Sequence, residues 1–266
     1  MKVFLSAIFS LFAIGAYAQL SLNATKMDHE IGLLLGASNY HGDLADEVVF
    51  AESHPSAGIF YRHNVNEYWA LRSTLSFMTI SGSDSNFQEY RLRNLSFKSD
   101  ILELSNIAEF NFQPFSSYPF HKNSTFYAFA GIAVMYHNPK AYMSGSWHKL
   151  HPLNTEDQPP KDRYNRVQVT IPFGGGVKFQ LSKNLMASWE LGWRKTFTDY
   201  LDDVSTSYPE VATNYQFTDR SWEVSDAGQY VAEPGDMRGD PDFKDWYIQT
   251  GITIAYRFTP IICWKN

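Results

Sequence analysis

The chain has 266 residues, a formal net charge of −6 at neutral pH and a sequence pI near 5.7. This acidic balance argues against nucleic-acid binding, which usually requires a basic surface, and about 250 residues can form a single all-β domain. Aromatic residues make up 16% of the chain although its mean hydropathy is −0.32. A membrane β-barrel with aromatic girdles, a polar interior and polar loops has this composition.

The first 18 residues have the features of a secretory signal peptide. Lys2 gives a positive start, a mostly apolar stretch follows, and Ala16-Tyr17-Ala18 forms a small-x-small cleavage pattern. Beyond it, no stretch approaches 18 consecutive apolar residues, which excludes helical membrane spans. The expected division is a signal peptide over residues 1–18, a barrel domain over residues 19–258 and a short periplasmic tail over residues 259–266.

Eight later segments alternate apolar and polar residues over about the length that a tilted membrane strand needs. In chain order these predicted strands are Glu30–Asn39, Ser56–Arg62, Trp69–Ile80, Ile101–Phe112, Thr125–His137, Val167–Leu181, Leu185–Phe197 and Trp246–Phe258. Each has one face suited to lipid and one suited to a polar interior. The exception is Thr125–His137, which is apolar on both faces. We predict a single eight-stranded antiparallel up-and-down outer-membrane β-barrel.

The last segment shows the alternation most clearly. Ile252, Ile254 and Tyr256 share one face, while Thr253 and Arg257 lie on the other. Its aromatic end resembles the terminal strand that barrel-assembly machinery recognises. The run at residues 174–176 is three consecutive glycines, but it lacks the lysine and following helix of a phosphate loop. We expect these glycines to allow strand curvature or close side-chain packing.

The predicted connections alternate in length. Short or moderate connections fall at residues 63–67, 114–123 and 181–184, and long ones at residues 40–55, 81–100, 138–166 and 198–244. Short turns at one end and long loops at the other are typical of outer-membrane barrels, whose long loops face outward. A soluble β-sandwich also uses alternating strands, but it does not predict this difference in length.

The predicted inner face collects charged residues of both signs. They are Arg62, Arg72, Glu103, Glu109, Lys178, Glu190, Arg194 and Arg257. The lumen of an eight-stranded barrel is only wide enough for side chains. We therefore expect an internal ion-pair network, since unpaired charge would be costly there. A catalytic carboxylate pair or an ion path is the functional alternative.

No constellation of residues singles out a catalytic or metal site. Asp199, Asp202 and Asp203 offer carboxylates that could bind calcium, but their spacing is not that of an EF-hand, and loop ordering is the simpler interpretation. The histidines are scattered, and His148 and His151 lack a third ligand nearby in sequence. We expect no enzyme activity and no cofactor, with a loop-borne enzyme site as the alternative.

The long loops carry unusual strings, which are Ser38–Leu44, Arg93–Phe97, Trp147–Leu150 with Thr155–Gln158, Asp199–Ser205 with Tyr208, and Arg238-Gly239 before Asp245-Trp246-Tyr247. Together they resemble the PorG-type outer-membrane barrels of the Bacteroidetes type IX secretion system, from about residue 30 to residue 258. One departure is Asp157, where the family pattern has glycine, which puts an identical backbone turn in doubt. We expect these loops to fold into an ordered cap over the barrel mouth.

This resemblance implies a non-enzymatic scaffold that anchors a periplasmic ring of PorK-type lipoproteins and PorN-type subunits to the outer membrane. The ring serves protein secretion and, in gliding species, motility. It could contact only the short turns and the tail, so the candidate contacts are His63, Lys183, Cys263 and Trp264. Cys263 is the single cysteine, and it is either a free thiol or an intermolecular disulfide partner. An outer-membrane enzyme and a small pore or ligand-binding barrel are the alternatives.

Overall fold

The computed structural model describes residues 28–45, 47–115, 123–159, 161, 163–211, 214–226 and 228–258. Within them the strands are β1 (His29–His41), β2 (His54–Asn64), β3 (Trp69–Ser83), β4 (Ser96–Asn111), β5 (Ser124–Met143), β6 (Ser146–Lys149), β7 (Val167–Gln180), β8 (Leu185–Thr196) and β9 (Trp246–Phe258). Short helical turns lie in the connections, namely η1 (Phe50–Glu52), η2 (Asp84–Asn86), α2 (Tyr215–Thr218) and η3 (Ser221–Glu223). None of these described helices is long and apolar enough to cross a membrane.

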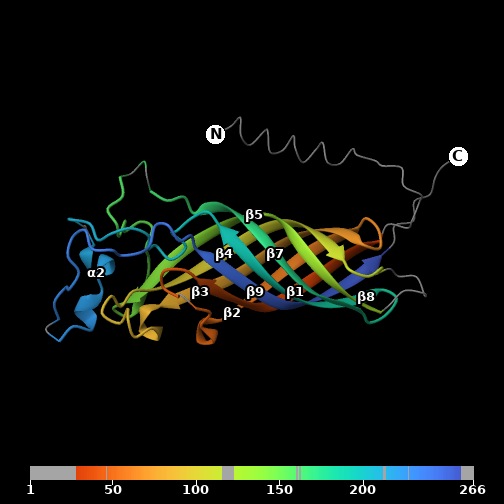
Figure 1. The fold of residues 1–266 in the computed structure, drawn as a ribbon, viewed down its shortest axis with the longest axis horizontal. Coiled ribbons are helices and arrows are strands. Elements are labelled where there is room, and N and C mark those ends of the chain that lie inside the picture. The colour runs from red at the N-terminus through yellow and green to blue at the C-terminus, as the bar shows by residue number, and fades with distance from the viewer. Residues whose placement is uncertain are drawn as a thin grey trace.

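The strands close into a barrel. Antiparallel pairing runs from β4 through β3, β2, β1, β9, β8 and β7 to β5, and a β4–β5 pairing joins the two ends of this series. The ring therefore has eight strands and no free sheet edge. The ninth strand, β6, is short and pairs with the end of β5 outside the ring. Figure 1 shows an elongated barrel with loops and α2 gathered beyond one end. The predicted all-β fold is confirmed.

Alternation along each strand places apolar side chains outside the barrel and polar ones inside. On β9, Ile252, Ile254 and Tyr256 are exposed, whereas Thr253 and Arg257 between them are buried. Every strand of the ring carries at least one exposed large apolar side chain on its outer face. A closed sheet satisfies its own backbone hydrogen bonds, and an apolar outer surface is suited to lipid rather than to water.

Strand β5 carries apolar residues on both faces because its inner face packs aromatic rings inside the barrel. Phe126 is exposed, whereas Tyr127 and Phe129 are buried. The paired strand β7 provides the room: a Cβ atom on Gly174 would lie 2.9 Å from the Phe129 ring, and one on Gly176 would lie 2.9 Å from the Tyr127 ring. The glycine run therefore allows close side-chain packing, as predicted.

Two strands extend further than predicted. β4 begins at Ser96, five residues before the expected start, and β5 continues to Met143, six residues past the expected end. The added segments pair with each other, and Lys140 Nζ lies 2.6 Å from Asp100 Oδ2 across them. Our assignment of these residues to loops was wrong. Backbone pairing continues beyond the apolar belt, where polar residues interrupt the alternation of apolar and polar side chains.

The connections differ in length less regularly than predicted, since the β4–β5 connection over residues 112–123 is as long as those over residues 42–53 and 84–95. Residues 65–68 and 181–184 form short turns at one end of the barrel. The other end carries four long connections over residues 42–53, 84–95, 144–166 and 197–245. The connection between β4 and β5 includes residues 116–122, which lie outside the described residues.

Candidate functional site

The barrel interior contains a network of ion pairs around Glu109 of β4. Its carboxylate lies 2.9 Å from Nε of Arg62, 2.9 Å from Nε of Arg72 and 2.6 Å from Nζ of Lys178. All of these side chains are buried. A buried carboxylate is costly to desolvate unless cations surround it. These contacts compensate the charge of Glu109 with cations from β2, β3 and β7.

Two further levels of the interior repeat this pairing. Arg72 Nη1 lies 2.7 Å from Glu190 Oε2, and the Tyr127 hydroxyl donates to the same oxygen at 2.7 Å. Closer to the long loops, Arg194 Nε lies 3.7 Å from Glu103 Oε1. The network therefore joins strands from opposite sides of the barrel and fills the lumen with paired side chains. This arrangement suits a structural role rather than an ion path.

Glu30 at the start of β1 completes the network. It lies 2.6 Å from Arg62 and 2.8 Å from Arg257. The sequence analysis did not single it out, although it shares a strand face with the buried Leu34. The structure places all the predicted interior residues inside the barrel. With Glu30, the buried charges number five cations and four carboxylates, namely Arg62, Arg72, Lys178, Arg194 and Arg257 with Glu30, Glu103, Glu109 and Glu190.

The long connections fold together beyond one end of the barrel (Figure 1). We call the described residues of these four connections the loop cap. Its apolar centre continues into the barrel wall, since one cluster of buried residues contains loop side chains together with Met78 and Ile80 of β3. The loop members of this cluster are Leu44, Ala45, Leu95, Leu150, Leu201, Val204 and Phe217. The ordered cap that the sequence analysis expected is therefore present.

Arg93 ties three of the long connections together. Its Nε and Nη2 donate to the Asp84 carboxylate at 2.8 and 2.6 Å. Its Nη2 also donates to the carbonyl oxygen of Asp43 at 2.8 Å, and its Nη1 to that of Arg238 at 2.7 Å. One guanidinium thus satisfies a buried carboxylate and two backbone carbonyls from distant parts of the chain.

Arg238 holds a second junction of the loop cap. It is fully buried and donates to Glu156 Oε1 at 2.9 Å, to the Asp203 carbonyl at 2.6 Å and to the Thr218 carbonyl at 3.2 Å. Glu156 in turn accepts from the backbone N–H of Ser205 at 2.9 Å. The strings that carry the family resemblance therefore meet in space and contact one another.

Asp157, the residue that departs from the family pattern, adopts a left-handed backbone conformation. Its φ is +48°, a region that glycine enters without steric cost and that aspartate tolerates better than most residues. Its N–H donates to the carbonyl oxygen of Asn154 at 3.0 Å. The chain therefore forms here the kind of turn for which glycine is suited, although aspartate occupies the position.

The predicted carboxylate trio is divided among different partners. Asp199 accepts from Ser205 Oγ at 2.6 Å. Asp203 accepts from Thr155 Oγ1 at 2.5 Å, and Asp202 faces Tyr40 on β1. Burial raises the pKa of both Asp199 and Asp203 to about 6. These contacts order the loops, and they do not bring the trio together as ligands of one calcium ion.

The two histidines that are closest in sequence also have separate partners. His148 Nε2 lies 2.8 Å from Ser146 Oγ, and His151 Nε2 lies 3.1 Å from the Tyr164 carbonyl. Across the described part of the chain, no group of three or more His, Cys, Asp or Glu side chains is arranged to hold a metal ion. The two histidines therefore form local loop contacts.

Tyr40 joins two carboxyl groups inside the loop cap. Its hydroxyl oxygen lies 2.8 Å from Asp202 Oδ2 and 2.5 Å from Asp245 Oδ1, and all three side chains are fully buried. A tyrosine hydroxyl has one proton, so it can donate to only one of them. The arrangement is satisfied when one carboxyl group keeps a proton and donates it to Tyr40. Burial raises the pKa of Asp202 well above its ordinary value, and the charge of Asp245 raises it further.

Two of the candidate partner contacts, His63 and Lys183, lie at the end with short turns. His63 near the end of β2 is half-buried, and its Nδ1 lies 3.3 Å from that of His29. Lys183 is exposed in the turn between β7 and β8. Cys263 and Trp264 lie outside the described residues. The structure thus offers Lys183 as an accessible cation on this rim.

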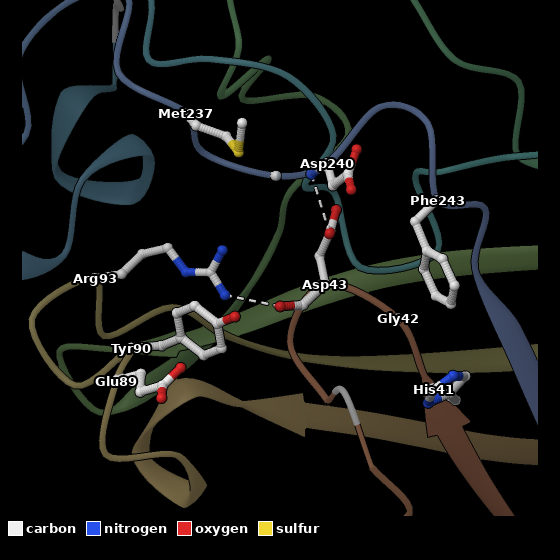
Figure 2. Close-up of a pocket in the computed structure, with 10 residues that line it drawn as sticks. His41, Gly42, Asp43, Glu89, Tyr90, Arg93, Met237, Asp240 and Phe243 are labelled. Carbon is white, nitrogen blue, oxygen red and sulfur yellow. Dashed lines mark hydrogen bonds between the residues drawn. The ribbon is translucent and has the colours of Figure 1, made fainter.

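The loop cap also contains a cavity of about 720 Å³, which the sequence analysis did not predict (Figure 2). Carboxylates from three connections line it, namely Asp43, Glu89 and Asp240, together with the rings of Tyr90 and Phe243. The backbone N–H of Asp240 donates to Asp43 Oδ1 at 3.1 Å across 197 positions of sequence. Burial raises the pKa of Asp43 to about 7. No short motif could reveal a site assembled from such distant segments.

The family model for DUF6089, a domain of unknown function, matches residues 4–266, and the chain belongs to this family. No curated protein matches the sequence. Among solved structures, the chain is similar to Ail of Yersinia pestis, with 12% identity, 88% of this chain and 100% of that chain covered, and a TM-score of 0.43. It is similar to Neisserial surface protein A with 9% identity, coverage of 86% and 97%, and a TM-score of 0.42. For OprG of Pseudomonas aeruginosa these values are 7%, 88%, 97% and 0.41. The fold assignment rests on the chain's own strand pairing.

Proposed function

We propose that this member of the DUF6089 family is an integral outer-membrane barrel and a non-enzymatic scaffold of the type IX secretion system. In this function it anchors a periplasmic ring of PorK-type and PorN-type subunits to the outer membrane. The membrane location is supported by the closed ring of eight strands with its apolar outer surface. The expected signal peptide, cleaved after Ala18, agrees with export.

The observation that carries the secretion assignment is the set of strings that resemble PorG-type barrels. Residues of these strings make the contacts that hold the loop cap, with Arg93 and Arg238 at its two junctions. Because these residues hold the loop cap together, the resemblance concerns residues with a defined structural role and not composition alone. The assignment to Bacteroidetes and the link to gliding motility rest on the same resemblance.

The interior favours a scaffold over a conducting pore. Nine buried charged side chains lie inside the barrel and pair across it, which fits a lumen that holds side chains rather than a water column. The loop carboxylates considered for calcium binding are engaged in hydrogen bonds that order the loop cap. The barrel therefore suits a protein that works through its surfaces.

The ring would bind the rim that carries the short turns. Lys183 is exposed there, His63 lies at the same end, and the tail with Cys263 and Trp264 follows β9 in sequence. We propose that these residues contact the ring. Cys263 would form an intermolecular disulfide with a ring subunit in the oxidising periplasm.

Affinity purification of the tagged full-length protein from envelopes, followed by mass spectrometry, tests this function. PorK-type and PorN-type subunits should co-purify, and Lys183→Glu should lower their recovery. The matched control is Lys161→Glu, which reverses the charge of an exposed lysine in the loop cap. A barrel that stays in the membrane but recovers no ring subunit would contradict the proposal.

Non-reducing electrophoresis of envelopes tests the disulfide separately. A high-mass band that reduction removes should be present in the wild type and absent in Cys263→Ser. Absence of this band in the wild type would refute the disulfide. Recovery of ring subunits in the affinity purification would still decide whether the ring binds this rim.

A further inference from the structure

The loop cap presents a hollow surface at the end of the barrel opposite the short turns. The cavity of about 720 Å³ adjoins a second one of about 360 Å³, since Arg93 and Met237 line both. Figure 2 shows side chains from three connections around the first cavity. We call the two cavities together the cap groove. Its size exceeds what a single ion needs and is within the range of sites that hold organic groups.

The charge of the cap groove is negative. Glu89 and Asp240 contribute carboxylates to the first cavity beside Asp43, whose pKa of about 7 leaves it partly protonated at neutral pH, and Asp219 and Asp236 line the second. Glu89 and Asp240 are exposed. Asp43 Oδ2 is buried and accepts no hydrogen bond within the described residues. These groups favour a cationic ligand and disfavour an anionic one such as a phosphorylated lipid.

The one arginine of the groove does not offset this charge. The guanidinium of Arg93 already donates to both carboxylate oxygens of Asp84 and to two backbone carbonyls. The Asp84 carboxylate lies 2.6 Å from Arg93 Nη2 in an ion pair, so it compensates the charge of Arg93. The carboxylates that face the cavity therefore remain without a cation of their own among the described lining residues.

Apolar side chains are exposed along the same groove. Met237 is 74% exposed and Leu92 is 61% exposed, and Val231 adds a further exposed apolar surface in the second cavity. The rings of Tyr90 and Phe243 line the first cavity, and the Arg93 guanidinium already lies 4.7 Å from the centroid of the Tyr90 ring. Aromatic rings bind ammonium and guanidinium groups by their faces, and clustered exposed apolar side chains mark interaction surfaces.

We propose that the cap groove binds a polypeptide segment in which lysine or arginine residues alternate with apolar residues. The cationic groups would lie against Glu89, Asp240 and the ring of Phe243, and the apolar side chains against Met237 and Leu92. This inference uses the orientation of the proposed barrel, in which the loop cap faces away from the periplasm. It does not require the secretion function.

The test measures peptide binding to the full-length barrel in detergent by fluorescence anisotropy. The probes are labelled acetyl-Lys-Leu-Lys-Leu-Lys-amide and acetyl-Glu-Leu-Glu-Leu-Glu-amide, both in EDTA at physiological ionic strength. The basic peptide should bind and the acidic one should not. Glu89→Gln with Asp240→Asn should weaken binding of the basic peptide about 2- to 30-fold, the combined effect expected for two exposed ion pairs.

The matched control is Glu47→Gln with Asp226→Asn, which removes two exposed carboxylates outside the groove. This control should bind the basic peptide with wild-type affinity. An equal loss of affinity in both double variants would show nonspecific electrostatic attraction to the surface and would overturn the proposed site. Met237→Gln keeps the charge and should weaken binding through lost apolar contact. Equal binding of both peptides, or of neither, also overturns the proposal. Unchanged ring recovery with the Glu89/Asp240 variant separates this result from a failure of the scaffold function.

Discussion

The barrel interior and the loop cap treat buried charge in different ways. In the described residues, the interior buries five cations and four carboxylates, while the loop cap buries two arginines and six aspartates, which are Arg220 and Arg238 with Asp84, Asp199, Asp202, Asp203, Asp219 and Asp245. The interior therefore satisfies its carboxylates with ion pairs. The loop cap satisfies many of its own with hydroxyl groups, backbone N–H groups and a retained proton. We infer that the stability of the loop cap depends on pH.

The largest expected effect is in the interior. Glu109→Ala leaves three cations without their shared partner and should cost about 3–5 kcal/mol, as removal of one member of a buried ion network does. Urea unfolding of the barrel in detergent, followed by the mobility shift between folded and unfolded forms, measures this loss. The exposed Glu89→Ala is the control and should change stability little. A loss below 1 kcal/mol for Glu109→Ala would show that the network does not stabilise the barrel.

The cap junction at Arg238 should give a smaller and more local effect. Arg238→Met removes hydrogen bonds to Glu156 and to two backbone carbonyls, which are worth about 1.5–3 kcal/mol when a charged group takes part. Limited proteolysis should then cut the loop cap faster while the barrel stays folded. Arg91→Met changes an exposed arginine of the same cap and should leave the cleavage rate unchanged. Equal rates in both variants would contradict this account of the junction.

The comparison also predicts a pH dependence of the loop cap. Carboxyl groups with raised pKa values stabilise the folded cap most when they are protonated, so their contribution is present below the ordinary value of 3.8 and is lost as the pH rises through the folded value. The values of about 6 for Asp199 and Asp203 and about 7 for Asp43 place this loss between about pH 4 and pH 7. Burial also raises the pKa of Asp202, so its contribution to cap stability is likewise lost as the pH rises. The rate of hydrogen exchange of the cap amides should therefore increase over this pH range by more than the intrinsic exchange rate of unprotected amides.

Asp202→Asn isolates the retained proton. The amide that it introduces can donate to Tyr40 at every pH, while its carbonyl can still accept from the Val204 N–H. The variant should protect the cap more than the wild type at alkaline pH and equally in mild acid. Asp226→Asn, an exposed control, should follow the wild type. Faster exchange of the Asp202→Asn cap above pH 7 would show that the carboxylate is needed in its charged form.

The smallest expected effect is at Asp157. Its φ of +48° is a conformation that glycine adopts freely, so Asp157→Gly should change cap stability by less than about 1 kcal/mol, in the stabilising direction. Thermal unfolding monitored at the loops measures the change. Asp226→Gly at a residue without positive φ should instead lower stability slightly. A marked destabilisation by Asp157→Gly would show that the carboxylate rather than the backbone governs this turn.

The sequence predicted the barrel because alternation is a local property of each strand. The charges of Arg62, Glu109 and Lys178 stood out inside because they interrupt apolar runs at the correct parity. Glu30 was missed because it lies at the end of a strand whose inner face also contains glycines. The strand extensions were missed because strand pairing beyond the apolar belt does not require an alternation of apolar and polar residues.

The cap groove and the contacts of Tyr40 with Asp202 and Asp245 could not be predicted from the sequence. Tyr40 and Asp245 are 205 positions apart, and Asp43 and Asp240 are 197 apart. Only the closure of β1 against β9 brings these pairs together. The resemblance to PorG-type barrels indicated which loop strings matter, but the contacts among them follow from the three-dimensional fold.

The most direct test of the account asks on which side of the membrane each end of the barrel lies. In a Cys263→Ser background, Asp226→Cys in the loop cap and Lys183→Cys in the β7–β8 turn are labelled in intact cells with a membrane-impermeant maleimide. The account predicts labelling at position 226 in intact cells, and at position 183 only after the outer membrane is opened. Labelling at 183 without labelling at 226, or equal labelling of both in intact cells, would contradict a membrane-spanning barrel with its loop cap outside.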